Sequence, residues 1–142
     1  MFIKQLSVFA ENRTGSIMEI TGALGSAGVN IRALSIADTA DYGIVRLIVD
    51  KSEEAADALR ARGIAVLETD VIAVSVSDTP GGFHVALEAL YEGSVSIEYA
   101  YAFVAPVGGG ATVIMRCREP EKAVELLRAR GLKLLEQSEV SL

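Results

Sequence analysis

The chain has 142 residues, of which 51% are hydrophobic and 23% charged, a composition typical of a folded globular protein. Its formal net charge of -6 argues against nucleic acid and anionic membranes as partners, because both are bound by basic surfaces. The single cysteine, Cys117, cannot form a disulfide within the chain, and the first residues lack the apolar core of a secretory signal. These features predict a cytoplasmic protein without a membrane-spanning segment.

The first half of the chain predicts a strand, a helix, two strands and a second helix. Ser16 and Glu19 have the spacing of a capping box, and glycines stand where the two helices should end. In the first strand, Leu6 and Val8 should face a core while Gln5 and Ser7 face solvent. The expected strands are residues 2–10, 30–37 and 44–49, and the expected helices begin at Ser16 and Ser52 and end at Gly28 and Gly63.

The second half predicts the same order of elements. Residues 64–77 have strand character almost throughout, and this stretch should provide both the last strand of the first half and the first strand of the second. No linker rich in Pro, Ser or Gly separates the halves. The further expected strands are residues 95–104, 112–115 and 132–140, with one helix ending at Gly93 and another starting at Pro120.

Three pairs of matching segments show that the chain contains two copies of one supersecondary unit. The first two pairs are 66 positions apart and the third is 68 apart, which places a two-residue insertion between them, in the glycine-rich turn at Gly108-Gly109-Gly110. The pairs are Gly15 with Gly81, Val29-Asn30-Ile31 with Val95-Ser96-Ile97, and Leu59-Arg60-Ala61-Arg62-Gly63 with Leu127-Arg128-Ala129-Arg130-Gly131.

The repeated order of elements predicts an α+β fold. Each repeat has the strand-helix-strand-strand-helix-strand order of a ferredoxin-like unit, with an antiparallel sheet and its helices on one face. We expect residues 1–70 to form the first repeat and residues 71–142 the second. A unit of about 60–70 residues buries only about 60% of its unfolded surface and is marginally stable alone, so the repeats should pack on each other or on another chain.

The glycine-bearing turn after the first strand of each repeat is a candidate ligand site. Free N–H groups at the start of the following helix can bind a carboxylate, and Gly15, Gly81 and Gly82 leave the backbone accessible. Asn12 in the first repeat, or Asp78 in the second, can accept hydrogen bonds from an ammonium group. The alternative is that these residues only form tight turns, which is their common role in proteins.

The turn Glu11-Asn12-Arg13-Thr14-Gly15, followed by Gly28-Val29-Asn30-Ile31, resembles the ACT domain family of regulatory modules, here present twice. The first repeat resembles the serine-sensing ACT domains of phosphoglycerate dehydrogenases. The second repeat keeps the family's Pro-Gly turn as Pro80-Gly81, whereas the first has Thr14 in place of the proline. Nearly the whole chain is covered by the resemblance.

The ACT resemblance implies how the protein works. Members of the family pair side by side and bind amino acids at the seam between the first loop of one domain and the second strand of its neighbour. It therefore implies an amino-acid-binding regulatory protein, forming a homodimer and acting on a separate metabolic enzyme. The ligand-binding residues that it implies are Asn12, Arg13, Thr14, Gly15, Ser16, Asn30 and Ile31, with Asp78, Pro80, Gly81, Gly82, Ser96 and Ile97 in the second repeat.

Other signals are weak. His84 is the only histidine, which excludes a His-rich metal site, and Cys117 lacks the partner cysteines of a zinc site. No nucleophile-base or paired-carboxylate arrangement is evident, so we expect no catalytic residues, metal or cofactor. Tyr99 and Tyr101 alternate on one strand and are more typical of sheet packing or an interface than of base stacking. Two functions stay open, a small-molecule sensor and a ligand-free structural or interaction module that regulates a separate enzyme. An enzyme is a distant third.

Overall fold

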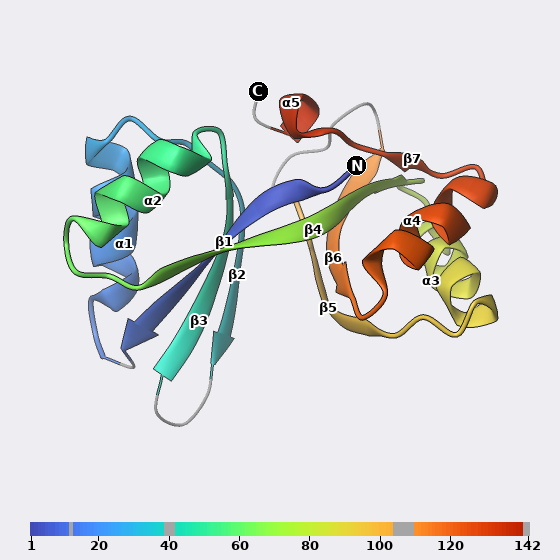
Figure 1. Ribbon diagram of the computed structural model, residues 1–142, viewed down its shortest axis with the longest axis horizontal. Helices are drawn as coiled ribbons and strands as arrows, with labels where there is room; N and C mark the ends of the chain where they lie inside the picture. Colours follow the sequence, from blue (N-terminus) through green and yellow to red (C-terminus); the bar gives the residue numbers. More distant parts are fainter. Residues whose placement is uncertain (12, 39–41, 104–109, 141–142) are drawn as a thin grey trace. The chain divides into compact units, whose positions relative to one another are not determined.

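The computed structural model describes residues 1–11, 13–38, 42–103 and 110–140. Within these residues the chain divides into two compact units. Lys4–Thr69 belongs to the first unit, and Asp70–Val140 together with Met1–Ile3 belongs to the second. The chain passes from one unit to the other inside the long strand β4 (Val66–Val76), so this strand serves both units, as predicted for this stretch (Figure 1).

The first unit has the predicted order of elements. They are β1 (Ile3–Glu11), α1 (Ser16–Ser26), β2 (Ile31–Asp38), β3 (Tyr42–Val49), α2 (Ser52–Arg60) and the beginning of β4. β1 and β2 pair with β3 in antiparallel register, and β1 neighbours β4, so the strand order is β4-β1-β3-β2. Within the described residues, β2 is therefore an edge strand.

The second unit repeats this arrangement. It consists of the rest of β4, α3 (Gly82–Glu92), β5 (Ile97–Ala102), β6 (Ala111–Cys117), α4 (Pro120–Ala129), β7 (Lys133–Leu134) and a short α5 (Gln137–Val140). β6 pairs with β4 and β5, and β7 pairs with β4, all antiparallel, which gives the order β7-β4-β6-β5. The predicted α+β class with two βαββαβ repeats is confirmed, and β5 takes the edge position that β2 has in the first unit.

Sheet register locates the two-residue insertion that distinguishes the second repeat from the first. Ile31 pairs with Val49 in the first unit and Ile97 pairs with Cys117 in the second, so equivalent residues are 66 apart in the edge strands and 68 apart in their neighbours. The two additional residues therefore fall between β5 and β6. The expected turn at Gly108-Gly109-Gly110 lies in this connection, but residues 104–109 are outside the described part of the chain.

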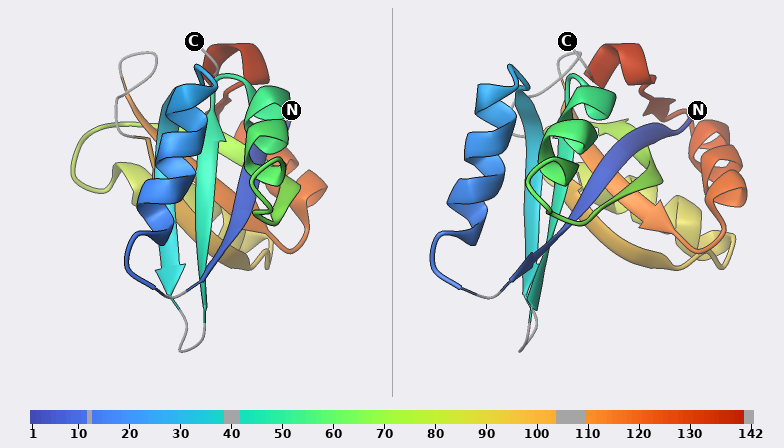
Figure 2. Two further views of the ribbon diagram at one scale, coloured as in Figure 1. Left: turned by 90° about the vertical axis from the view of Figure 1, so that its left-hand side faces the viewer. Right: turned by 60° about the vertical axis from the view of Figure 1, so that its left-hand side comes forward.

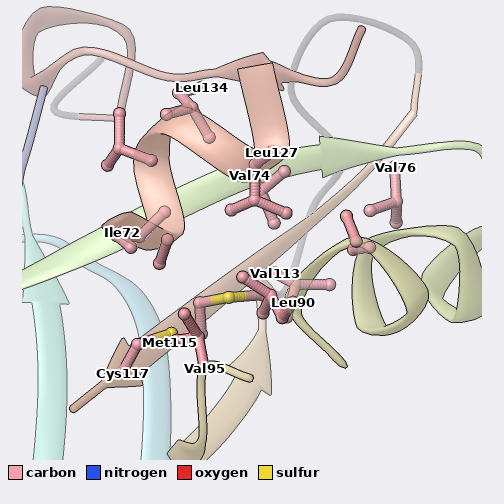
Figure 3. Packing of buried hydrophobic residues seen from close by; sticks show 14 residues of the cluster. Ile72, Val74, Val76, Leu90, Val95, Val113, Met115, Cys117, Leu127 and Leu134 are labelled. Atoms are coloured by element: carbon pink, nitrogen blue, oxygen red, sulfur yellow. The ribbon is translucent and has the colours of Figure 1, made fainter. Parts of the chain in front are cut away.

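In each unit the two helices pack side by side on one face of the sheet, as expected (Figure 2). Alternate strand residues and one stripe of each helix meet between these layers. In the second unit, Ile72 and Val74 of β4 and Met115 of β6 point toward Leu90 and Leu127 of the helices (Figure 3). Fully burying a side chain of this size contributes about 1.5–3 kcal/mol, so this layer holds each unit together.

Glycines end three of the four long helices in a left-handed conformation. After α1, Gly28 has a φ of 72°, and the Val29 N–H donates to the Leu24 carbonyl at 2.9 Å, which is the bond of a Schellman motif. Gly63 and Gly131 have φ values of 74° and 83° after α2 and α4. The predicted stops at Gly28 and Gly63 are confirmed.

The end of α3 differs from the prediction. Gly93 has an ordinary φ of -91°, and the following residue, Ser94, takes the left-handed position with a φ of 58°. The Val95 N–H still donates to the Leu90 carbonyl at 2.9 Å, so the motif is intact with a serine at its strained position. Gly93 is needed for packing, because a Cβ there would overlap the Leu126 side chain.

The predicted helix caps are wrong by one residue. Gly15 and Lys51 occupy the N-cap positions of α1 and α2, and neither helix has a side-chain cap. Ser16 is instead the first residue of α1, where its hydroxyl donates to the Glu11 carbonyl at 2.8 Å. This bond ties the helix to the end of β1, and the N-cap position itself is taken by Gly15, which has no side chain to accept from the free N–H groups.

The predicted strand over residues 132–140 is also wrong. β7 has two residues, and the chain then turns into α5. The Glu136 N–H donates to the Glu139 carboxylate at 3.0 Å, which is one arm of a capping box and starts the helix. Lys133 pairs with the same carboxylate at 3.1 Å, and together these contacts lower the pKa of Glu139, the backbone bond most.

The polar side of β1 does not face solvent, contrary to the prediction of a half-buried strand. Gln5 is 0% exposed and Ser7 is 8% exposed. The Gln5 amide donates to the Ser7 hydroxyl at 3.2 Å, which supplies a partner for groups that would otherwise be buried unpaired. β1 is thus buried on both faces over most of its length.

Candidate functional site

The turn before the first helix of each unit has the same backbone form. Gly15 and Gly81 both have left-handed conformations, with φ values of 91° and 82°, and each directly precedes a helix. A Cβ at either position would meet nothing within 4 Å, so the backbone angle and not the available space requires glycine. The equivalence of the two turns, deduced from the repeat, is confirmed in backbone conformation.

The helix that follows each turn begins without a side-chain cap among the described residues. The Ser16 N–H donates to the Arg13 carbonyl at 3.3 Å, and the Gly82 N–H donates to the Thr79 carbonyl at 2.9 Å. The other N–H groups of the first turn point out of the helix start, where the helix dipole is positive. Both helix starts are therefore suited to a carboxylate.

The predicted contact residues of the first turn differ in what they do. Asn12 lies outside the described residues. Arg13 donates to Glu19 at 2.8 Å and to Glu11 at 3.0 Å, and these two carboxylates raise the pKa of its guanidinium, Glu19 most. Thr14 is exposed. The one cation of this turn is thus already engaged by acidic side chains.

A hollow lies beside the first turn, within the first unit. Its volume is ≈ 170 Å³, and it opens between the turn, the start of α1 and the ends of β2 and β3. We call it the first hollow. Its lining residues are Ala10, Glu11, Arg13, Ser16, Ile17, Ile36, Gly43 and Val45.

A second hollow lies at the equivalent place in the second unit, with a volume of ≈ 320 Å³. Asp78, an exposed residue of the turn, is at its rim, whereas Pro80 and Gly81 are exposed nearby and do not line it. Its lining residues are Val76, Ser77, Asp78, Thr79, Phe83, Ala100, Tyr101, Ala102, Ala111 and Val113.

The predicted residues at the start of the edge strands lie elsewhere. Within one unit, Asn30 and Ile31 are at the end of β2 opposite the turn, since Ile31 pairs with Val49 whereas Ile36 pairs with Val45 beside the hollow. The Asn30 N–H donates to the Asp50 carboxylate at 2.9 Å. A single repeat therefore does not bring its own turn and its own strand start together.

Ser96 and Ile97 hold the same position in the second unit. The Ser96 carbonyl accepts from the Arg118 N–H at 3.1 Å, as the Asn30 carbonyl accepts from the Asp50 N–H. Both edge strands then have a register shift, which falls at Arg32 in the first unit and at Glu98 in the second. The buried Nε of Arg32 has no hydrogen-bond partner among the described residues.

Sequence reasoning missed the side chains that form most of each hollow. Ile36 and Val45 in the first unit, and Phe83, Ala102 and Val113 in the second, were not singled out as contact residues. One signal was present in the alignment of the repeats, because Ala100 and Ala102 stand where the first repeat has Leu34 and Ile36.

The weaker candidates behave as expected of surface and core residues. The His84 side chain is 71% exposed and lies 4.0 Å from Glu88 on the outer face of α3. Cys117 is buried, and burial, with Glu98 as a lesser cause, raises the pKa of its thiol to about 11. Over the described ranges, no three or more His, Cys, Asp or Glu side chains are placed to hold a metal ion. The helices in these ranges are all too short or too polar to cross a membrane.

Two consecutive βαββαβ units, each with a glycine turn and a hollow beside its edge strand, define a tandem α+β protein with a regulatory type of fold. The chain belongs to the ACT domain pair family, whose model matches residues 1–142. The resemblance inferred from the turns is thereby confirmed.

Solved structures agree with this family. The chain is similar to protein BT0572 from Bacteroides thetaiotaomicron, with 37% identity over 99% of this chain and 96% of that one, at a TM-score of 0.92. It shares the fold of the aspartate kinase regulatory subunits from Thermus thermophilus and Thermus flavus, with 16% and 14% identity and a TM-score of 0.61 for both. These matches cover 89% and 90% of this chain and 91% and 92% of those chains. No curated protein matches the sequence.

Proposed function

We propose that this protein is an amino-acid-binding regulatory protein, in which residues 1–70 and 71–142 form two ACT repeats. The observation that carries the proposal is the pair of hollows at equivalent positions, each beside an uncapped helix start. A free amino acid needs sites for an anion and a cation a few ångströms apart, and each turn has candidates for both.

The carboxylate of the ligand meets N–H groups in the first turn of α1 or α3. Its ammonium group donates to Asn12 in the first repeat or to Asp78 in the second, and to nearby backbone carbonyls. Hydrogen bonds to charged groups contribute about 1.5–3 kcal/mol each, so these two anchors provide most of the orientation of the ligand. The other turn residues that surround it are Arg13, Thr14, Gly15 and Ser16, or Pro80, Gly81 and Gly82.

The far wall of the site comes from the second strand of the other repeat. Asn30 and Ile31, or Ser96 and Ile97, would close it. β2 and β5 are the outermost strands, at opposite ends of the strand order, so each leaves an edge open to a further strand. The unpartnered Nε of Arg32, next to Ile31, is a further donor for a carboxylate. Apolar surface that remains exposed is covered in a homodimer.

The regulatory role is supported by the fold shared with aspartate kinase regulatory subunits. In the proposed mechanism, ligand binding changes the assembly of the protein or the activity of a separate metabolic enzyme. The protein itself carries out no reaction and requires no metal or cofactor.

A thermal-shift screen of the full chain against the twenty amino acids tests the proposal. A ligand at 100 times its Kd stabilises the folded state by about 2.7 kcal/mol, which gives a readily measured rise in Tm. For the best ligand, calorimetry on Asn12→Ala and Asp78→Ala should show binding weakened about tenfold in at least one of them. Asp57→Ala, which removes an exposed carboxylate from α2, is the control and should bind as the parent does.

A ligand-free interaction module is the second candidate. It is favoured by the exposed apolar side chains of edge strand β2, where Leu34 is 40% and Ile36 is 53% exposed. If no amino acid shifts the Tm, or if both turn variants bind as tightly as the parent, the two glycine turns have no role in ligand binding. The interaction module is then the better description of this protein.

A further inference from the structure

We propose that the second hollow, and not the first, receives the side chain of the amino acid ligand, and that it selects an apolar side chain. This inference rests on the proposed function. It adds which repeat binds and what class of amino acid fits. Four features of the two hollows carry it, namely their size, the chemistry of their walls, the polar groups at their rims and the packing that frames them.

The size difference has a clear origin in the edge strands. Ile36 pairs with Val45 in the first unit, and Ala102 pairs with Val113 at the equivalent place in the second. Replacing the large side chain by a methyl group opens the space between the edge strand and the helix start. The volumes agree with this difference, since the first hollow has ≈ 170 Å³ and the second ≈ 320 Å³. Small-molecule sites in proteins hold about 300–1,000 Å³, so only the second of these two reaches this range.

The walls of the second hollow suit an apolar group. Val76, Phe83, Ala111 and Val113 contribute to its lining, and Ala102 adds a methyl group at its edge. An aliphatic or aromatic side chain that enters this space leaves water, and the gain grows with the apolar area removed from water. A charged or hydroxyl-bearing side chain would give up its hydration against these residues, since the polar side chains of the lining belong to Ser77, Asp78, Thr79 and Tyr101.

The polar groups at the rims also differ. At the first hollow, Arg13 is held by Glu11 and Glu19, so its guanidinium is already engaged. Asp78 is the charged residue in the lining of the second hollow. At the second hollow, Ser77 and Thr79 stand at the positions of Glu11 and Arg13. Their hydroxyls share a hydrogen bond of 2.8 Å, which uses one of two protons and leaves the other to donate to a carboxylate.

The second hollow is also framed by close backbone packing. A Cβ at Gly82 would overlap the carbonyl of Ser77, and a Cβ at Gly110 would lie 2.5 Å from the carbonyl oxygen of Val76. The end of β4 therefore lies close against the start of α3 and the start of β6. A site that is already formed loses less conformational freedom when the ligand binds.

Calorimetry on the full chain, with a matched pair of variants, tests the inference. The probes are leucine, methionine and phenylalanine, compared with serine, aspartate and glycine. Ala102→Ile gives the second repeat the isoleucine that the first repeat has at the equivalent position, and Ile36→Ala gives the first repeat the alanine of the second. Both positions are exposed on edge strands, and an unliganded melting curve confirms that each variant folds.

We expect the parent to bind one apolar amino acid per chain and to prefer it to the three others. Ala102→Ile should weaken this binding about tenfold to a hundredfold, because the side chain of the ligand loses its space. Ile36→Ala should leave the affinity within about twofold of the parent, because Ile36 lines the first hollow and not the second.

The outcomes separate this inference from the function on which it rests. If serine, aspartate or glycine binds best, if Ala102→Ile binds like the parent, or if Ile36→Ala is the variant that loses binding, this inference is wrong and the amino-acid-binding function stands. If none of the twenty amino acids binds the parent, both are wrong.

Discussion

Replacing Ser94 by glycine should stabilise the protein. Ser94 follows α3 with a φ of 58° and is the only non-glycine residue in the described ranges with a positive φ. The equivalent residue in the first repeat is Gly28, with a φ of 72°. Ser94 is exposed and its side chain makes no hydrogen bond with the residues that the structure describes, so the substitution relieves backbone strain without removing a contact.

The magnitude follows from two opposing terms. A residue with a Cβ pays about 1–2 kcal/mol for the left-handed conformation. Glycine avoids that cost but loses more conformational freedom on folding, which reduces the gain in stability by about 0.5–1 kcal/mol. The net gain should be about 0.5–1 kcal/mol, and in a chain of this length the Tm should rise by about 1–4 °C.

Thermal and urea unfolding of Ser94→Gly, Gly28→Ser and Gly93→Ala, each compared with the parent, measure the effect. Gly28→Ser imposes the same strain on the first repeat and should lower the stability by a similar amount. Gly93→Ala should destabilise by about 1–3 kcal/mol, because its Cβ would overlap Leu126. The reasoning is refuted if Ser94→Gly is neutral or destabilising while Gly28→Ser is tolerated.

Three further predictions concern the turns and the core. Gly82→Ala should destabilise by about 1–3 kcal/mol in urea unfolding, because the new Cβ would overlap the Ser77 carbonyl, which cannot move without the strand. Ser16→Ala should cost about 1 kcal/mol in the same assay, since it removes the hydroxyl that donates to the Glu11 carbonyl; an unchanged midpoint would show that water replaces this bond. The buried thiol of Cys117 has a pKa of about 11 against 9.0 when unfolded, so unfolding releases a proton between these values and the free energy of unfolding should fall as the pH rises from 9 to 11. Cys117→Ala should remove that part of the pH dependence, and an identical pH profile in the variant would contradict the assignment.

Much of the fold could be predicted because its signals are local. The helix stops at Gly28 and Gly63 follow from the conformational freedom of glycine, and the order of elements follows from the periodicity of apolar residues. The last strand could not be predicted in this way. Residues 132–140 have strand character, but the Glu136 N–H finds a partner in Glu139, and that contact is decided by backbone geometry at the end of β7.

The candidate site could be predicted only in part. The two glycine turns and the helix starts were found from the repeat, and the structure gives both turns the expected backbone form. The roles of Asn12, Asp78 and the strand starts remain proposals. Gln5 shows the limit of pattern reasoning, because alternation predicts which residues share a face but not whether that face is covered.

The sequence by itself determined that one βαββαβ unit occurs twice and where its turns and helix ends fall, because spacing, glycine positions and the alternation of apolar residues are properties of neighbouring residues. Only the tertiary structure decided that the two units differ in what they could hold. Phe83, Ala102 and Val113 come from α3, β5 and β6, and the register of β5 on β6 places Ala102 opposite Val113 beside one hollow. The volume of a hollow depends on which side chains the fold brings together, so the exchange of Ile36 for Ala102 has its effect only in the folded protein.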